Sequence, residues 1–198
     1  MLRISRHLLA AAFAGLLLAP AAGQAAESSY TVLDLDKCSH TPGKADEDYG
    51  EWRCHGFAGI PVYVSAGDQR SFISYGRKGE DEPAARQTLA AFNGEGKAIE
   101  WRWERPAHGK IKPFATIVRW STTVSSGDEV VRGEVLVVTR LAPGAVCHIG
   151  YVDARANADA EALARKIADE TTRNFRCGTD KPLTLGSKGP GFSGPYGD

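Results

Sequence analysis

The first 26 residues constrain this chain most, because they read as an export signal and so decide what its cysteines can do. A basic start leads into an apolar run over residues 8–18, and small residues follow Pro20. These are the three parts of a secretory signal peptide. We therefore expect residues 1–25 to be a signal peptide that is cleaved after Ala25, and a mature protein that is periplasmic or secreted.

Two alternatives to this processing stay open, namely cleavage after Ala22 or Ala26 and retention of the segment as an anchor. The apolar run is shorter than the ~20 residues that a bilayer-spanning helix needs. No cysteine stands near the cut to accept a lipid. The sequence therefore favours a soluble product without a membrane anchor.

The chain has four cysteines, and an even number in an exported protein favours disulfides over free thiols or metal ligands. We expect the pairs Cys38–Cys54 and Cys147–Cys177. The second pair has a geometric basis. The strand leaving Cys147 travels about 20 Å outward, and the helix after it returns about 25 Å, so that Cys177 arrives near Cys147. Such a bridge would contribute roughly 3–4 kcal/mol.

The spacing of the cysteines also argues against other uses. No pair has C-x-x-C spacing, and no histidine pair complements them as in a zinc site. The same absence counts against a thioredoxin-type redox site.

Composition indicates one domain of ordinary character. The whole sequence has 24 basic and 24 acidic residues, and it contains no basic run. It therefore lacks the electrostatic footprint of a nucleic-acid-binding protein and the polybasic segment that binds anionic lipid. We expect no nucleic-acid partner, and the oligomeric state stays unknown.

Hydrophobic periodicity predicts an α+β fold with a mostly antiparallel sheet of about seven strands. A short helix is expected near residues 82–92, and a C-terminal helix near 158–175 is expected to pack on the sheet. Residues 26–177 then form a single domain, and the Gly/Pro-rich residues 178–198 are expected to be a disordered tail. The segments with strand character are 30–35, 52–57, 60–65, 70–75, 98–105, 113–124, 129–141 and 144–154.

Alternation is cleanest in residues 98–105, where large apolar and charged side chains take turns. Ile99, Trp101 and Trp103 should point to one face of the sheet. The opposite face should carry Glu100, Arg102 and Glu104. Because tryptophan rings normally bury a large area, we expect Trp101 and Trp103 in the core.

Catalytic signatures are missing from the sequence. It contains no G-x-S-x-G on a strand-to-helix turn and no glycine-rich phosphate loop, and the acidic loop at residues 46–50 lacks the ligands of a complete calcium site. We expect no catalytic, cofactor-binding or metal-binding residues. The histidines that remain after processing are interpreted as ordinary surface or half-buried residues: His40, His55, His108 and His148.

One exposed surface is a candidate contact patch, on the expectation that neighbouring hairpins bring its members together. It comprises Trp52, Arg53, His55, Asp68 and Arg70.

Several local patterns carry a resemblance to known proteins. They are Leu33-Asp34-Leu35 followed by Cys38, the run Trp52-Arg53-Cys54-x-Gly56, and Gly67-Asp68-x-Arg70. Over roughly residues 30–105 the chain resembles exported proteins of alphaproteobacteria to which no function is assigned. The resemblance implies a periplasmic location and supplies no activity. Periplasmic lysozyme inhibitors share the small, disulfide-bonded, mostly β format, but their Ser-Gly loop with a following Tyr is not reproduced at Ser126-Gly127.

The sequence therefore predicts an exported domain that binds an envelope protein, a peptide or a glycan without catalysis. The alternative is a periplasmic hydrolase whose site is assembled from distant residues. Such a site would combine His55, His108 or His148 with Asp68 or Glu100.

Overall fold

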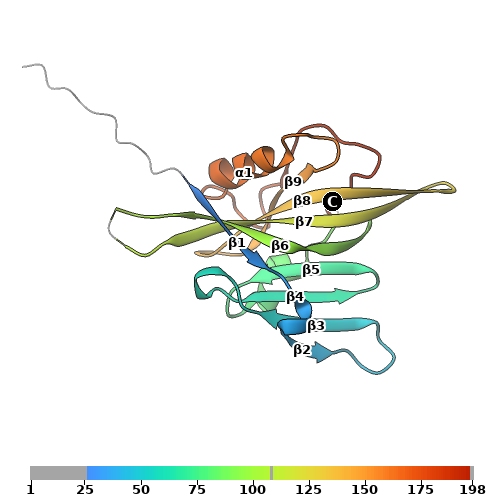
Figure 1. Ribbon diagram of the computed structural model, residues 1–198, viewed down its shortest axis with the longest axis horizontal. Helices are drawn as coiled ribbons and strands as arrows, with labels where there is room; N and C mark the ends of the chain where they lie inside the picture. The colour runs from blue at the N-terminus through green and yellow to red at the C-terminus, as the bar shows by residue number, and fades with distance from the viewer. Residues whose placement is uncertain (1–25, 108, 197–198) are drawn as a thin grey trace, which may run out of the picture.

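The computed structural model describes residues 26–107 and 109–196, which form three layers (Figure 1). A four-stranded sheet lies below a six-stranded sheet, and one α-helix covers the other face of the larger sheet. The strands of the larger sheet, sheet A, are β1 (Glu27–Val32), β6 (Phe92–Glu104), β7 (Lys112–Ser126), β8 (Glu129–Arg140), β9 (Cys147–Asp153) and β10 (Leu183–Leu185). The strands of the smaller sheet, sheet B, are β2 (Ser39–Pro42), β3 (Tyr49–Cys54), β4 (Val62–Gly67) and β5 (Arg70–Tyr75).

Helical segments are few in the described part of the chain. The α-helix α1 spans Ala160–Thr171. The short 3₁₀ turns are η1 (Leu35–Lys37), η2 (Phe57–Gly59), η3 (Gly79–Asp81) and η4 (Pro83–Arg86). None of the helices among the described residues is long and apolar enough to span a membrane.

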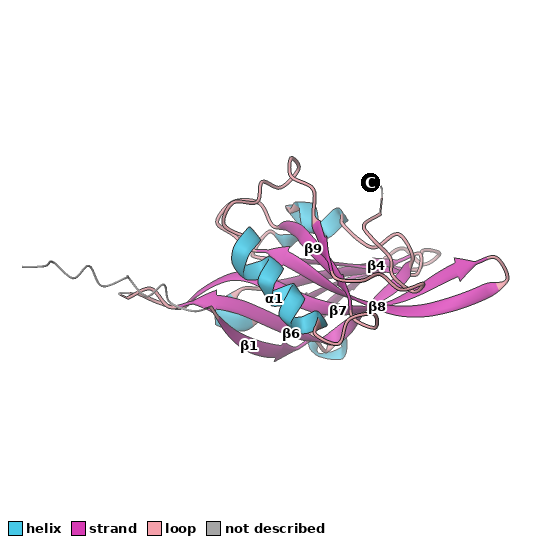
Figure 2. Ribbon diagram, turned by 90° about the horizontal axis from the view of Figure 1, so that it is seen from above, coloured by secondary structure: helices cyan, strands magenta, loops and turns pink. Residues whose placement is uncertain are grey.

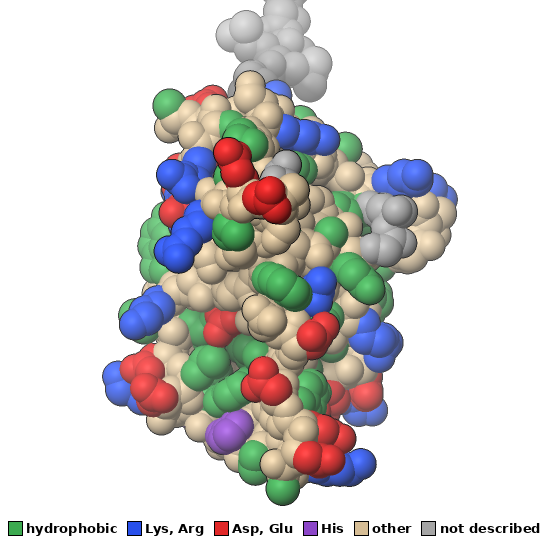
Figure 3. All heavy atoms as spheres, turned by 90° about the vertical axis from the view of Figure 1, so that its right-hand side faces the viewer, with side chains coloured by type: hydrophobic (Ala, Val, Ile, Leu, Met, Phe, Trp, Pro, Cys, Tyr) green, Lys and Arg blue, Asp and Glu red, His purple; other side chains and the backbone are tan. Residues whose placement is uncertain are grey.

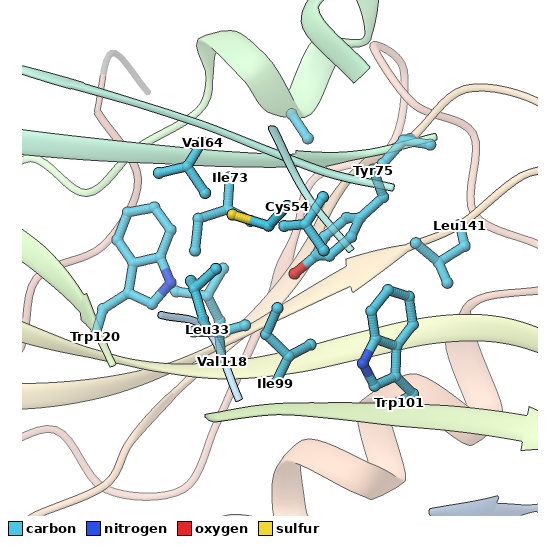
Figure 4. Close-up of a cluster of buried hydrophobic side chains, with 14 of the residues drawn as sticks. Leu33, Cys54, Val64, Ile73, Tyr75, Ile99, Trp101, Val118, Trp120 and Leu141 are labelled. Carbon is cyan, nitrogen blue, oxygen red and sulfur yellow. The ribbon is translucent and has the colours of Figure 1, made fainter. Parts of the chain in front are cut away.

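The two sheets enclose the main hydrophobic core (Figure 4). Trp101 and Trp120 enter it from sheet A, and Ile73 and Tyr75 enter it from sheet B. Burying such large rings removes much apolar surface from water, and this burial holds the sheets together. The prediction that Trp101 lies in the core is confirmed, because its side chain is fully buried.

The opposite face of sheet A packs on α1 through a second hydrophobic cluster. Ile167 and Ala164 of the helix contact this face, and Gly150 of β9 leaves room for the Ile167 side chain. A Cβ atom at Gly150 would lie 2.7 Å from an Ile167 methyl carbon, so only glycine allows the helix to approach this closely.

Ion pairs complete the contact between α1 and sheet A. Arg102 donates to Asp169 of the helix at 2.6 Å, and Glu100 accepts from Arg165 at 2.6 Å. The charged side chains of β6 therefore face the helix, as the alternation of residues 98–105 predicts. Burial opposes ionisation of the Glu100 carboxyl, but hydrogen bonds from Arg165 and Ser28 outweigh it and lower its pKa.

Both expected disulfides are present and the described residues contain no free cysteine. Cys38–Cys54 joins the end of β3 to the turn before β2. Cys147–Cys177 joins the start of β9 to the segment after α1, over a sequence separation of 30 residues. The strand-and-helix return path predicted for this pair is confirmed.

The strand count and the helix positions differ from the sequence-based expectation. The described residues hold ten strands in two sheets rather than about seven in one, and the C-terminal helix is shorter than residues 158–175. The prediction of a helix over residues 82–92 is wrong, because only the 3₁₀ turn η4 forms there; it ends at Arg86 and an extended segment follows. The N–H group of Ala84 in η4 donates to the carbonyl oxygen of Val146, and that of Ala90 in the extended segment donates to the carbonyl oxygen of Gly194. These backbone donors are therefore bound to distant segments.

The C-terminal residues are also placed differently from the disordered tail that the composition suggests. Strand β10 pairs parallel to β9, and Pro195 forms a β-bridge with Leu89. Between them the chain crosses sheet A at Gly133, where a Cβ atom would lie 2.0 Å from the carbonyl oxygen of Gly191. The glycines of this segment therefore permit close backbone packing.

Candidate functional site

One end of the molecule gathers several loops around a hollow (Figure 3). The β2–β3 loop, the β4–β5 turn and the C-terminal segment contribute to it, and its volume is about 710 Å³. We call it the Arg70 groove, and its lining residues are Glu47, Asp48, Tyr49, Gly67, Asp68, Gln69, Arg70, Phe72, Thr88 and Tyr196. On this end of the molecule acidic and hydrophobic side chains lie next to one another (Figure 3).

The β4–β5 turn shapes the rim of the groove. Asp68 and Gln69 connect the two strands with φ angles of 48° and 58°, which lie in the left-handed region. Two-residue hairpin turns of this kind favour Asn-Gly or Asp-Gly, so Gln69 adopts a costly conformation for its residue type. The turn projects both polar side chains into the lining of the groove.

The floor of the groove depends on a glycine. A Cβ atom at Gly67 would lie 2.7 Å from the carbonyl oxygen of Asp48 and 3.1 Å from the Tyr49 ring. Only glycine therefore lets the β2–β3 loop fold against the end of β4. This contact brings Asp48 and Tyr49 to the groove.

Arg70 holds the wall of the groove together. Its guanidinium donates to the Asp68 carboxylate at 3.1 Å and to the carbonyl oxygen of Ala90 at 3.1 Å. The guanidinium carbon lies 5.1 Å from the ring centroid of Phe92 and 5.3 Å from that of Tyr196. At these distances a cation attracts the face of an aromatic ring. Arg70 thereby fixes the C-terminal Tyr196 beside the β4–β5 turn.

Aromatic rings supply the apolar part of the lining. Tyr49, Phe72 and Tyr196 come from β3, β5 and the C-terminal segment, and Tyr196 is 67% exposed. The Tyr49 hydroxyl donates to the Glu51 carboxylate at 2.8 Å. Burial and the hydrogen bonds of this hydroxyl raise its pKa, so the ring stays neutral at physiological pH.

Carboxylates, an amide and a hydroxyl supply the polar part of the lining. The Lys44 ammonium lies 3.7 Å from the Glu47 carboxylate, and the Asp68 carboxylate is paired with the Arg70 guanidinium. The Thr88 hydroxyl is buried; it donates to the carbonyl oxygen of Ser71 at 2.8 Å and accepts from the Asn93 side-chain amide at 3.1 Å. The groove thus combines ring faces with several hydrogen-bonding groups.

A smaller hollow of about 310 Å³ adjoins the groove and shares Tyr49 and Arg70 with it. His40 and Trp52 line it and stack on one another, with ring centroids 4.7 Å apart and an interplanar angle of 13°. The stack covers Gly50, where a Cβ atom would lie 2.7 Å from the Trp52 ring.

The structure separates the contact patch that the sequence suggests. Asp68 and Arg70 line the Arg70 groove, and Trp52 lines the adjoining hollow. Arg53 does not join them, since it points to the outer face of sheet B, over the Tyr63 ring, and pairs with Glu80 at 2.9 Å. His55 follows Cys54 at the opposite end of β3. The expected proximity fails for these two because the patch spans the length of β3, and both residues lie toward the end away from the β4–β5 turn. Alternation along β3 also places Arg53 and Trp52 on opposite faces of the sheet.

The histidines do not assemble the site that the hydrolase alternative requires. His148 is 1% exposed, and its Nδ1 atom lies 3.1 Å from the Tyr151 hydroxyl. Glu100 is engaged by Arg165 and Ser28, and Asp68 by Arg70. Within residues 26–107 and 109–196 no hydrogen bond joins a histidine to either carboxylate. His108 lies outside the described residues.

The described residues also offer no candidate metal site. Among the residues that the structure describes, no group of three or more His, Cys, Asp or Glu side chains is placed to hold a metal ion.

Sequence reasoning missed most of the groove. Tyr196 falls in the predicted disordered tail, and Tyr49 falls in the loop expected before the strand at residues 52–57. Their common signal is exposure of a large aromatic side chain, which a single sequence does not reveal. No protein-family model, no curated protein and no solved structure matches the chain.

Proposed function

We propose that this chain is an exported binding protein that takes a glycan of the cell envelope in the Arg70 groove. The observation that carries the proposal is the lining of the groove, in which exposed tyrosine rings stand beside carboxylate, amide and hydroxyl groups. A sugar ring presents an apolar C–H face and a rim of hydroxyls. Aromatic faces match the former, and mixed donors and acceptors match the latter.

The size of the groove supports a ligand of this kind. Its volume of about 710 Å³ lies within the range of sites for small ligands, roughly 300–1,000 Å³. The adjoining hollow with the His40–Trp52 stack offers a second aromatic surface next to the groove.

The two disulfides support the compartment. Disulfides persist in oxidising environments such as the periplasm or the cell exterior, and they are rare in the cytosol. Together with the signal-like residues 1–25, they favour export and therefore a ligand that belongs to the envelope.

The proposal is tested by titrating ¹⁵N-labelled protein (residues 26–198) with a β-1,4-linked N-acetylglucosamine oligosaccharide and, separately, with soluble peptidoglycan fragments. We expect the amide resonances of Gly67, Gln69 and Arg70 to shift in a saturable way with both probes. Tyr196→Ala should weaken binding about tenfold, because it removes one stacking ring. Tyr30→Ala, which removes an exposed tyrosine far from the groove, is the matched control and should bind normally.

Binding of the peptidoglycan fragments alone, with no response to the pure oligosaccharide, would assign the groove to the stem peptide and would contradict the glycan proposal. Absence of any saturable shift at Gly67, Gln69 and Arg70 with either probe would contradict it as well.

A further inference from the structure

Strand β1 is an edge of sheet A, with β6 on one side and no strand on the other among the described residues (Figure 2). Its register with β6 is continuous from Glu27, which pairs with Trp103, to Val32, which pairs with Ala98. The edge is independent of the Arg70 groove, to which β1 contributes no residue.

One hydrogen bond just after the end of β1 shows which of its main-chain N–H and C=O groups point toward β6 and which point away from it. The N–H of Leu33 donates to the carbonyl oxygen of Lys97 at 2.8 Å, and Leu33 stands opposite Lys97 if the register continues. In an antiparallel pair, hydrogen-bonded and non-hydrogen-bonded positions alternate. The main-chain groups of Ser28, Tyr30 and Val32 therefore point away from β6, toward the open edge.

The side chains at this edge are unusual for an unpaired strand. Val32 is 74% exposed and Tyr30 is 60% exposed, and both alternate onto the face of sheet A that carries α1. The sequence of β1 contains no Lys, Pro or Gly and has no bulge against β6. Proteins commonly protect an edge by such devices, and an edge without them pairs readily with another strand.

We propose that β1 pairs antiparallel with β1 of a second copy of this chain, about a two-fold axis at Tyr30. The outward-pointing set is symmetric about Tyr30, so Ser28 of each copy meets Val32 of the other, and all three positions exchange main-chain hydrogen bonds. A two-fold interface requires such a self-matching register, and the choice of a second copy depends on the side chains that this register brings together.

Side chains agree with this register. Val32 stands opposite Ser28, and Glu27 stands opposite Leu33 of the second copy, so no like charges meet. Tyr30 of one copy stands opposite Tyr30 of the other. Within each copy the Tyr30 hydroxyl accepts a hydrogen bond from Arg165, whose charge is balanced by Glu100. Because the contact consists of one strand pair and few side chains, it is smaller than a standard interface, and we expect a weak, concentration-dependent dimer.

Self-cross-linking tests the axis directly. Opposed residues in a hydrogen-bonded antiparallel pair have Cα atoms about 5.5 Å apart, a distance that a disulfide bridges. Tyr30→Cys should therefore yield a disulfide-linked dimer under mild oxidation, seen on a non-reducing gel. The matched control Val32→Cys adds the same extra thiol away from the axis and should stay uncross-linked.

A second variant tests the main-chain contact without a new thiol. Val32→Pro removes an N–H group that points outward and leaves the bonds to β6 intact. By light scattering over a concentration series, the unmodified protein (residues 26–198) should approach twice the monomer mass. Val32→Pro should dimerise at least about tenfold more weakly, because two hydrogen bonds are lost per dimer. A monomer at every concentration, or cross-linking of Tyr30→Cys no faster than that of Val32→Cys, would overturn the proposal.

Discussion

His148 shows how strongly burial controls a single side chain in this fold. Its ring lies between Tyr151 and the edge of Trp120, and burial lowers its pKa from 6.5 to about 3. The imidazole is therefore neutral at physiological pH. A neutral, enclosed histidine suits a core position better than a proton-transferring role near pH 7.

This lowered pKa predicts a dependence of stability on pH. As the pH falls below about 6.5, the unfolded chain takes up a proton at His148, whereas the folded chain does so only near pH 3. The folded state therefore loses up to about 1.4 kcal/mol per pH unit over that window. Urea unfolding at about pH 7 and about pH 4.5 measures the loss.

The variant His148→Phe should flatten this dependence, because it removes the group that titrates. His55→Phe alters an exposed histidine and serves as the control, for which we expect the same slope as for the unmodified protein. Equal slopes for all three proteins would show that His148 does not carry the effect.

At the scale of elements, α1 is fastened to sheet A by charges as well as by its apolar stripe. Arg102 is 6% exposed and donates to Asp169 through both Nε and Nη2, at 2.9 and 2.6 Å. Such a paired and hydrogen-bonded geometry compensates the cost of removing a guanidinium from water.

Loss of the Asp169 carboxylate should therefore lower the stability of the fold markedly. Asp169→Ala leaves the Arg102 charge buried with little compensation, and we expect the free energy of unfolding to fall by about 3 kcal/mol. Asp180→Ala removes a carboxylate whose partner, the Arg176 guanidinium, is exposed to solvent, and should cost much less. Denaturant unfolding of both variants gives the comparison, and similar losses would contradict the structural role of the Arg102–Asp169 pair.

Most strands could be predicted from the sequence because their side chains alternate locally, as in residues 98–105. The division into two sheets could not, because it depends on which strands pair over long separations. The helix expected near residues 82–92 rested on the spacing of Ala85, Leu89 and Phe92. Leu89 is buried, but from an extended segment whose neighbouring N–H groups bind distant carbonyls.

At the scale of the whole molecule, the groove is made by parts that lie far apart in the sequence. Asp68 and Arg70 could be predicted as surface partners because a tight turn brings them together. Tyr196 could not, because its place depends on Gly133 and Gly191, which let the C-terminal segment cross sheet A. Composition alone suggests that such a glycine-rich segment has little to bury, whereas Phe192 packs against the main core.

The disulfides connect the fold to the compartment. Cys147–Cys177 fastens the segment after α1 to β9, and Cys38–Cys54 ties the end of β3 to the turn before β2, at the end of these strands away from the groove. Because both disulfides belong to the fold, and because the proposed ligand belongs to the envelope, we expect the chain to mature where thiols oxidise.

Intact-mass spectrometry of the unreduced protein, recovered from the periplasmic fraction of the cells that produce it, tests this expectation most directly. We predict a chain that begins at Ala26 and weighs four hydrogens less than its all-thiol form, since each of the two disulfides removes two hydrogens. A chain that still begins at Met1, is found in the cytosol and carries four free thiols would contradict the account.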